Sequence, residues 1–389
     1  MNPSRDGSNS SHGNRGESPG VYDRTSEKWR KYPADVLPLF VAEMDFELAP
    51  AVSQALYDAI ERSDTGYAWP PALREIFSRY AKNCFDWTVP AERVFVVNDV
   101  MGGVTETLRA LTQPGDGVAI MPPVYPPFFE IVRTAERHVV EVELLRDGMQ
   151  YAINWDGLER AFARHAKALL LCHPHNPVGH VFARAELERL AALARSYGVL
   201  VISDEIHAPL VYPGAAHVPF VMVAEPQGID SVTLMSASKG WNIAGLKCAQ
   251  MIAGSSRVHE RFKQLPADVT DRIGHLGVIA TAAAYADGSS WLRTTLNRLD
   301  ENRRLLATLL ARQLPQIGYG VPDATYLAWL DCRALDLGDD PAQAFIDRGK
   351  VALSHGPDFG AAGRGFTRFN FATTPEIISE AVSRMALSA

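Results

Sequence analysis

Four short segments carry polar side chains directly after apolar runs, and side chains in such positions can do chemistry. In open α/β sheets, ligands bind outside the carboxyl ends of the strands. The apolar run 199–203 leads into Asp204. A carboxylate there is costly unless a cation partners it, and a protonated ring nitrogen would be such a partner. A helix N-cap or a structural salt bridge is the alternative interpretation.

The segment from Thr233 to Lys247 brings two hydroxyls and two lysines to the end of another apolar run. A lysine at the mouth of a buried strand loses solvation, so its pKa falls and its amine becomes able to form a Schiff base. Lys239 is the candidate for that role. Ser236, Ser238 and Lys247 offer hydroxyl donors and a positive charge for a phosphate. Taken alone, a surface lysine that follows a strand would be the more common interpretation of Lys239.

Asn176 and Arg368 complete the set of candidate residues. Asn176 follows the apolar run 168–172 and stands between two prolines, which hold its amide in a stiff, extended turn. Arg368 lies on an otherwise apolar segment and is suited to grip a carboxylate through two hydrogen bonds. A plain turn and a structural ion pair are the respective alternatives. The occurrence of all four segments at expected strand ends favours one shared ligand site.

The elements that would position these side chains alternate between short strands and helices. Helical spacing starts at Pro50 and recurs over 104–111 and 186–197. Near-continuous apolar runs indicate a sheet covered on both faces, and the alternation of strands with helices indicates a largely parallel α/β sheet. These runs predict strands at 94–97, 118–121, 168–172, 199–203, 232–235 and 248–252.

After about residue 287 the pattern changes to that of a smaller α+β domain. Its expected elements are a long charged helix at 291–313, a strand at 326–331, a helix at 342–348, a strand at 368–371 and a terminal helix. Residues 1–20 are rich in Ser, Gly, Asn and charge, so we expect them to be disordered.

The composition is that of an ordinary globular protein, with 389 residues of which 47% are hydrophobic and 21% charged. A net charge of -7 gives no electrostatic reason to expect nucleic acid or an anionic membrane as partner. Charged residues interrupt every apolar run, and the first residues lack an apolar signal core, so we expect a cytoplasmic protein.

The cysteines and histidines do not predict a metal centre. Cys84, Cys172, Cys248 and Cys332 are widely separated, so buried free thiols are expected rather than disulfides or a zinc site. His173 and His175 form the one close histidine pair in the sequence. No further residue with ligand spacing accompanies them, and we expect no metal.

Three further motifs, together with the four segments, make the chain resemble a known family. The pattern S-x-S-K-x-x-x-x-x-G-L-K, then D-E-I-H and N-P-V-G, is typical of pyridoxal 5'-phosphate (PLP) enzymes of fold type I, the aspartate aminotransferase superfamily. V-A-E-M-D-F at 41–46, T-G-Y at 65–67 and P-V-Y-P-P-F at 123–128 resemble the MalY/PatB-type cystathionine β-lyase (C–S lyase) branch of class I/II. The resemblance runs from about residue 25 to the C-terminus.

The resemblance implies a fold and a domain division. The fold is the α/β PLP-dependent transferase fold type I, in which helices cover a mostly parallel, seven-stranded sheet and a smaller α+β domain follows. The implied division is a disordered tail at 1–24, an N-terminal arm that joins the small domain at 25–48, a large PLP-binding domain at 49–286 and a small C-terminal domain at 287–389.

The resemblance also implies roles at the ring of the cofactor. Lys239 forms the Schiff base with PLP and later moves the Cα proton of the substrate. Asp204 pairs with the pyridinium nitrogen and keeps the ring an effective electron sink. Asn176 bonds the phenolic oxygen, and Tyr125 stacks on the ring and joins Lys239 and Asp204 as a catalytic residue. His207 contacts the cofactor where many aminotransferases have a tyrosine.

Two more sets of residues are implied for the phosphate and the substrate. Ser236, Ser238, Lys247 and the backbone N–H groups of Val100 and Met101 would hold the phosphate. Tyr67 would reach the phosphate of the neighbouring subunit, so a homodimer with shared active sites is implied. The amino-acid substrate would be bound by Arg368, which takes its α-carboxylate, together with Asn176 and Ala42.

Two departures from the branch concern the phosphate and the substrate. Relatives usually have Pro-Gly-Val-Val where this chain has Asn98-Asp99-Val100-Met101. An aspartate beside a phosphate is electrostatically unfavourable, so Asp99 either turns away as an N-cap or contacts the substrate. Phe40 replaces a tryptophan that is common in relatives.

The function implied is β-elimination from an S-substituted L-cysteine, such as cystathionine or another cysteine conjugate, with release of a thiol, pyruvate and ammonia. Transamination is the main alternative, and a specialised biosynthetic reaction on a cysteine conjugate is another. A nicotinamide dehydrogenase is disfavoured because no G-x-G-x-x-G follows a strand. A catalytically idle member of the fold is disfavoured because Lys239, Asp204 and Arg368 are all present.

Overall fold

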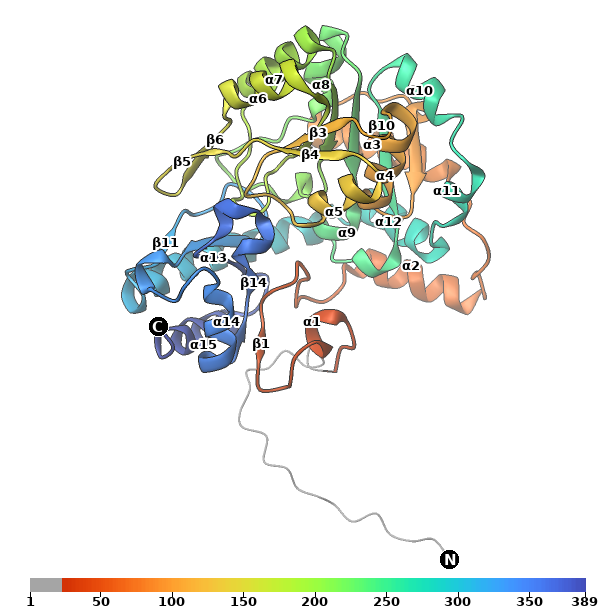
Figure 1. Ribbon diagram of the computed structural model, residues 1–389. Helices are drawn as coiled ribbons and strands as arrows, with labels where there is room; N and C mark the ends of the chain where they lie inside the picture. Colours follow the sequence, from red (N-terminus) through yellow and green to blue (C-terminus); the bar gives the residue numbers. More distant parts are fainter. Residues whose placement is uncertain (1–22) are drawn as a thin grey trace, which may run out of the picture.

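A computed structural model of the chain describes residues 23–389, and Figure 1 shows the arrangement of its elements. The predicted disordered tail, residues 1–24, therefore lies almost wholly outside the described residues. Within 23–389, no helix combines the length and the apolar character that a membrane span requires.

A seven-stranded sheet forms the centre of the larger part of the molecule, in the order β2-β10-β9-β8-β7-β3-β4. Only β10 runs antiparallel to its neighbours, β2 and β9, which confirms the predicted mostly parallel sheet. The strands are β2 (Val94–Val97), β3 (Gly117–Ile120), β4 (His138–Glu141), β7 (Ala166–Cys172), β8 (Leu200–Asp204), β9 (Ser231–Met235) and β10 (Ala249–Ala253).

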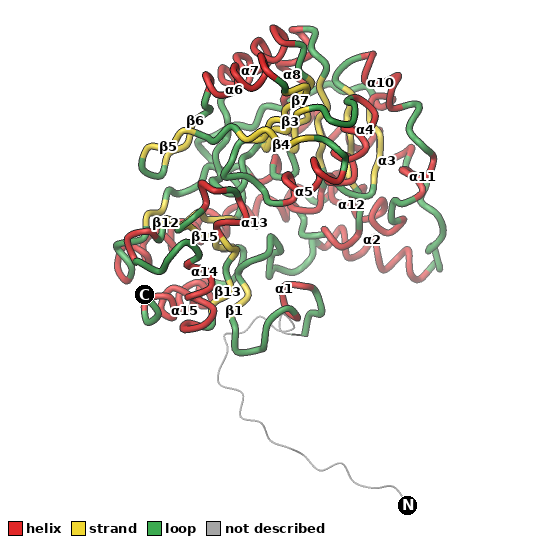
Figure 2. Tube along the Cα trace, in the orientation of Figure 1, coloured by secondary structure: helices red, strands yellow, loops and turns green. Residues whose placement is uncertain are grey.

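Helices cover both faces of this sheet, as Figure 2 shows. Successive residues of a strand point to opposite faces, and in β7 Leu169 packs into a different hydrophobic cluster from Leu170. Both faces are therefore apolar, which is why the strands read as continuous Val, Ile and Leu runs. The first face is covered by α6 (Trp155–Arg164), α7 (Arg184–Tyr197), α8 (Phe220–Ala224), α3 (Pro71–Phe85) and α12 (His275–Asp287). The second face is covered by α4 (Val100–Leu111), α5 (Pro127–Thr134) and α10 (Ser256–Phe262).

The last hundred residues build a second, four-stranded sheet in the order β11-β12-β15-β14. Most of its apolar side chains form one cluster with the helices of this part, whereas Trp329 and Phe366 pack into a cluster of the larger sheet. These elements are α13 (Ser289–Gln313), β11 (Gly318–Tyr319), β12 (Leu327–Asp331), α14 (Pro341–Gly349), β13 (Val351–Ala352), β14 (Ser354–His355), β15 (Phe366–Asn370) and α15 (Pro375–Ala386). Together with the large sheet, they confirm the predicted fold class.

The N-terminal arm lies against this smaller part. Strand β1 (Leu37–Pro38) pairs in parallel with β13, and Figure 1 shows α1 (Glu27–Arg30) beside it. We keep the division into 25–48, 49–286 and 287–389 as a proposal. Helix α13 begins two residues after that last boundary and its residues Leu299 and Leu306 belong to the core of the smaller part.

Several elements escaped sequence-based prediction. The edge strand β4 has an exposed–intermediate burial pattern and so lacks the apolar run that marked the central strands. The hairpin of β5 (Leu145–Asp147) and β6 (Gln150–Ala152) is mostly exposed for the same reason. The short helices α9 (Ala237–Gly240) and α11 (Ala267–Asp271) also escaped prediction, whereas α2 (Pro50–Glu61) begins at Pro50 as predicted.

The expectation of four buried cysteines was wrong for one of them. Cys172, Cys248 and Cys332 are buried free thiols, but Cys84 is exposed. Cys84 lies in the last turn of α3, on the solvent side of the helix.

Candidate active site

A cavity of about 360 Å³ opens at the edge of the large sheet where the parallel strands end. That volume suits a small ligand. Strands β2, β3, β7, β8 and β9 all run toward this edge, so the residues that follow them converge on it. The cavity is lined by every predicted site residue except Tyr67: Ala42, Val100, Met101, Tyr125, Asn176, Asp204, His207, Ser236, Ser238, Lys239, Lys247 and Arg368.

Asp204 lies at the floor of the cavity, at the end of β8. Burial raises the pKa of its carboxyl to about 7, and the Lys239 ammonium offsets this effect only in part. The Oδ1 atom accepts a hydrogen bond of 3.1 Å from the backbone N–H of Ile206. A buried acid whose pKa is this high lacks a full cationic partner, so the floor of the cavity is suited to a ligand that brings a positive charge.

Lys239 enters the cavity from the short helix α9, which starts where β9 ends. Its Nζ donates a hydrogen bond of 2.8 Å to the carbonyl oxygen of Ala42. Burial first, and then the positive charge of Arg368, lower the pKa of the amine to about 8. A substantial fraction of this lysine is therefore neutral near pH 8, as a nucleophile or base must be.

Arg368 projects from β15 in the smaller part and reaches the cavity beside Asn176. Its Nη1 donates to Asn176 Oδ1 at 3.0 Å, and its Nη2 donates to the Phe40 carbonyl at 2.9 Å and to Ser354 Oγ at 3.0 Å. The Nε atom is buried without a partner. Burial lowers the pKa of the guanidinium to about 10, so it remains charged at neutral pH and retains one donor for a ligand carboxylate.

His207 and Tyr125 complete the wall around Asp204. Burial, then the charges of Lys239 and Arg368, lower the pKa of His207 to about 3, so the imidazole is neutral. Its Nδ1 atom is buried without a hydrogen-bond partner. Tyr125 follows β3. Burial, and then the negative charge of Asp204, raise the pKa of its hydroxyl. Both side chains are therefore uncharged groups that can contact a planar ligand.

The opposite end of the cavity is open and charged. It is formed by the first turn of α4, whose N-cap is Asp99, and by Lys247 and the two predicted serines. Ser236 caps α9: its Oγ accepts from the N–H of Ser238 at 3.1 Å and donates to the Cys248 carbonyl at 2.7 Å. The Ser236 hydroxyl thus already has an acceptor in this structure.

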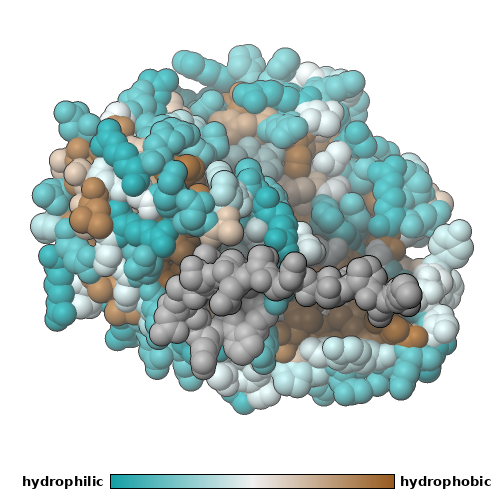
Figure 3. Space-filling view, turned by 90° about the horizontal axis from the view of Figure 1, so that it is seen from below, coloured by the Kyte–Doolittle hydropathy of each residue, from teal (hydrophilic) through white to brown (hydrophobic). Residues whose placement is uncertain are grey.

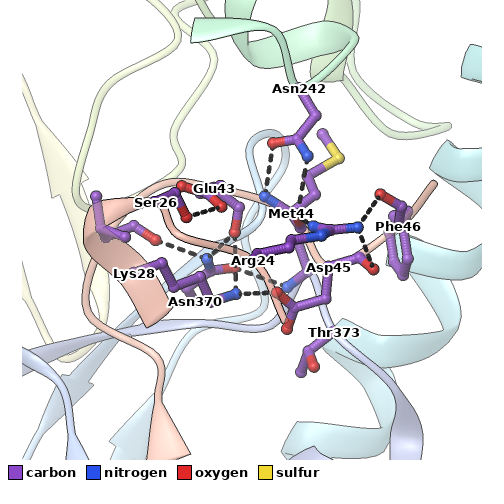
Figure 4. Close-up of polar contacts among 12 residues, drawn as sticks. Arg24, Ser26, Lys28, Glu43, Met44, Asp45, Phe46, Asn242, Asn370 and Thr373 are labelled. Carbon is purple, nitrogen blue, oxygen red and sulfur yellow. Dashed lines mark hydrogen bonds and ion pairs between the residues drawn. The ribbon is translucent and has the colours of Figure 1, made fainter. Parts of the chain in front are cut away.

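Val41 and Ala42, in the loop from residue 41 to residue 46, line the cavity together with Lys239. The N-terminal segment holds this loop in place (Figure 4). Lys28 Nζ lies 2.7 Å from Asp45 Oδ1 and 3.1 Å from the Glu43 carbonyl. Both side chains of this ion pair are almost fully buried. Arg24 donates to the carbonyls of Met44 and Phe46, each at 3.0 Å.

Two asparagines from other parts of the chain hold the same loop. Asn242, which follows α9, accepts from the N–H of Met44 and donates to its carbonyl. Asn370, at the end of β15, donates to the carbonyls of Val41 and Glu43 at 2.7 Å each. The carbonyl of Ala42, the acceptor for Lys239, is therefore positioned by side chains from three distant parts of the chain.

Tyr67 lies outside the cavity and is 97% exposed. Leu48, Tyr57, Ile60 and Trp69 are further large apolar side chains exposed in the same stretch of sequence. A hydrophobic area is visible in a hollow of the face seen from below (Figure 3). The predicted role of Tyr67 at a neighbouring subunit stays a prediction.

Sequence reasoning missed several residues of the site, and three of them make hydrogen bonds there. The Tyr326 hydroxyl donates to the Ala42 carbonyl at 3.0 Å, and Ser354 supports Arg368. Cys172 lines the cavity and accepts from the N–H of Asn176 at 3.4 Å. The position of Cys172 at the end of a predicted strand could have indicated it. No local signal distinguishes Tyr326 or Ser354.

Within residues 23–389, no group of three or more His, Cys, Asp or Glu side chains could hold a metal ion. The rings of His173 and His217 stack with centroids 4.4 Å apart. His175 Nε2 lies 2.9 Å from the Pro123 carbonyl oxygen. These histidines are packed into the body of the protein.

The cavity at the carboxyl edge of the parallel sheet brings together a neutralisable lysine, a buried acid and an arginine, which are the groups that lysine-dependent chemistry on a small carboxylate would need. The model of the family "Aminotransferase class I and II" matches residues 34–385. The chain therefore belongs to that family, as its motifs predicted.

The names of individual relatives agree with the cystathionine β-lyase branch that the motifs predicted. The chain is 44% identical to a Mycobacterium leprae protein whose name provisionally assigns it to the cystathionine beta-lyases, over 93% of this chain and 94% of that one. It is 36% identical to the cystathionine beta-lyase of Corynebacterium glutamicum, over 94% and 96%. The structure of cystalysin from Treponema denticola, which contains pyridoxal 5'-phosphate, matches with a TM-score of 0.88 at 30% identity, over 93% and 95%.

Proposed function

We propose that the protein is a PLP-dependent C–S β-lyase that converts an S-substituted L-cysteine into a thiol, pyruvate and ammonia. The observation that carries the proposal is the Lys239 amine, whose pKa is lowered to about 8 in a cavity shared with Asp204 and Arg368. The relatives named cystathionine beta-lyase support the reaction class. PLP, when bound, would supply an electron sink for the negative charge that develops on the substrate Cα.

The residues present fit this cofactor. The buried Asp204 carboxyl, whose pKa is raised to about 7, would gain the cationic partner it lacks from a protonated ring nitrogen. His207 Nδ1 is a buried polar atom without a partner beside the same floor. Lys247 and the N-terminus of α4 would hold the phosphate at the open end, with Ser238 beside them.

Arg368 and Asn176 would bind the substrate. Arg368 lines the cavity, and its Nη1 donates a hydrogen bond to Asn176 Oδ1 there. A substrate carboxylate bound there fixes the α-carbon next to Lys239. Such positioning is a large part of catalysis, because it replaces the improbable encounter of two free groups.

Lys239 would then act as the base that removes the proton from Cα. Its neutral form is accessible because the cavity desolvates the ammonium. After proton transfer, the ammonium can return to the Ala42 carbonyl, where the structure holds it at 2.8 Å. A thiolate is a good leaving group, so the site mainly has to align the Cα–H bond and limit access of water.

Two finer features are part of the proposal. We place the protein in the cytoplasm as a homodimer in which Tyr67 of one subunit approaches the phosphate end of the other. The support is the 97% exposure of Tyr67 and the exposed Tyr57, Ile60 and Trp69 in the same stretch. Apolar side chains gathered on one surface are typical of subunit interfaces.

Transamination is the second candidate, because the family model is that of the class I and II aminotransferases. The two reactions share Lys239, Asp204 and Arg368 and differ in where the proton is returned. Products therefore separate them. A specialised biosynthetic reaction on a cysteine conjugate would differ in the thiol released.

The test uses the purified protein supplied with PLP and a panel of S-conjugates that includes L-cystathionine. Pyruvate, ammonia and free thiol in equal amounts are expected. Lys239→Ala should abolish product formation and the absorbance band of the Schiff base, whereas Lys263→Ala, at an exposed lysine that follows α10, should change neither. A keto acid that retains the sulfur substituent, formed without free thiol, would refute the lyase in favour of the aminotransferase.

A further inference from the structure

The phosphate end of the cavity already contains an anion, the side chain of Asp99. Its Oδ1 accepts a hydrogen bond of 2.7 Å from the backbone N–H of Gly102, and its Oδ2 lies 3.1 Å from Lys247 Nζ. Asp99, Lys247, Val100 and Met101 all line the same cavity. One carboxylate thus bridges the helix N-terminus and the lysine that are proposed to hold the phosphate.

We propose that Asp99 is an internal competitor of the cofactor phosphate and thereby sets the affinity of the protein for PLP. This inference rests on the proposed function. Asp99 stabilises the protein without bound cofactor, because its carboxylate then neutralises Lys247 and caps α4. Cofactor binding requires the carboxylate to share or release these partners.

The competition follows from what a helix N-terminus and a lysine can satisfy. The first turn of the 12-residue helix α4 carries about half a positive charge and stabilises either a carboxylate or a phosphate. Lys247 adds one positive charge. The other cations that line the cavity are Lys239 and Arg368, which are occupied by the Ala42 carbonyl and by Asn176. A phosphate that joins Asp99 therefore brings two anions to one lysine.

The expected size of the effect is modest because both partners are partly open to solvent, with Asp99 35% and Lys247 57% exposed. An exposed ion pair and a helix-end charge each contribute up to about a factor of five in an equilibrium constant. We therefore expect removal of the Asp99 charge to tighten PLP binding by about tenfold, and high salt to weaken this gain because it screens exposed charges.

Asp99→Asn is the sharpest variant, because asparagine is an equally good N-cap and has nearly the same size. The dissociation constant of PLP is measured on the protein freed of cofactor, by titration of absorbance and by equilibrium dialysis, at low and high salt. Pyridoxal, which lacks the phosphate, is the matched ligand, and inorganic phosphate is titrated by calorimetry. Glu260→Gln on α10, whose partner is Lys263, is the matched loss of one negative charge.

The inference predicts that Asp99→Asn binds PLP and inorganic phosphate about tenfold more tightly, binds pyridoxal as the wild type does, and loses most of its advantage in high salt. Asp99→Ser, which also caps a helix, should behave in the same way. Unchanged or weaker binding of PLP by both variants, or an equal gain with Glu260→Gln, would overturn it. A wild-type protein that acquires no PLP at all would instead overturn the proposed function, and the phosphate titration still decides the role of Asp99.

Discussion

The two ends of the active site use the same pair of groups, a lysine and an aspartate, in opposite ways. At the closed end, Lys28 and Asp45 are 0% and 2% exposed and hold the loop over Lys239. At the open end, Lys247 and Asp99 are 57% and 35% exposed. Removing two charges from water is costly, so a buried pair must keep both partners, whereas an exposed pair can exchange one anion for another. The closed end is suited to fixed geometry, and the open end is suited to reversible binding.

Removal of one partner of the buried pair is the strongest test of this comparison, because it has the largest expected effect. Lys28→Met leaves Asp45 buried without its cation and should lower the free energy of unfolding by about 3–5 kcal/mol. The loop that carries Ala42 would also lose its anchor, so cofactor binding should weaken as well. Denaturant unfolding of the full chain measures the first effect.

Lys31→Met is the control for this prediction, because its ion pair with Glu27 lies in the same segment but is exposed. Lys31→Met should change the free energy of unfolding by no more than about 0.5 kcal/mol. If both variants unfold at the same denaturant concentration as the wild type, burial does not distinguish the two ends as we describe. Lys28→Arg should restore part of the stability, because it keeps the charge.

A smaller effect is expected from Arg368, which contacts the Phe40 carbonyl and is proposed to bind the substrate carboxylate. Arg368→Lys keeps the charge but not the planar fork. Loss of charge-assisted hydrogen bonds of about 1.5–3 kcal/mol should lower kcat/KM by about 10- to 100-fold, mainly through KM. Steady-state kinetics with a cysteine conjugate checks this.

The same kinetics with the corresponding conjugate of cysteamine, which has no carboxylate, tests the assigned role. With this substrate, the wild type and Arg368→Lys should have the same kcat/KM. An equal loss with both substrates would mean that Arg368 acts by holding Asn176 and the Phe40 loop, rather than by binding the carboxylate.

The smallest effect concerns the pH at which Lys239 becomes reactive. Burial lowers its pKa from 10.5 to about 8, so the rate at which the cofactor-free protein captures pyridoxal should rise as the pH rises through about 8 and then level off. Between these two values the unfolded chain binds more protons at this site than the folded chain. Stability should therefore increase with pH over that window as far as this lysine is concerned. A rate that keeps rising to pH 10 would contradict the desolvated environment.

Much of the fold could be predicted because buried strands leave a strong signal. Residues such as Leu169 and Leu170 are both buried, on opposite faces, so the central strands appear as unbroken apolar runs. Strand β4 is half exposed at the sheet edge and leaves no such run. Local sequence therefore located the centre of the sheet better than its margins.

The residues of the candidate site also fall into those with a local sequence signal and those without one. Asp204, Lys239 and Asn176 could be found from sequence because each lies within four residues of the end of an apolar run, and the topology of a parallel sheet brings such positions together. Tyr326 and Ser354 act through single hydrogen bonds to residues that are distant in sequence. The role of Asp99 also remained open in the sequence, since both an N-cap and a ligand contact were compatible with it.

By itself, the sequence determined the class of sheet, the edge at which the cavity opens, and most of the side chains that line it. These depend on the pattern of apolar runs, which is local. Only the tertiary structure decided that the Ala42 carbonyl receives Lys239, that Lys28 and Asp45 lie buried together, and that Asp99 spans a helix end and Lys247. Such contacts depend on how much water the fold leaves around each charge, and that is a property of the packed molecule rather than of any segment.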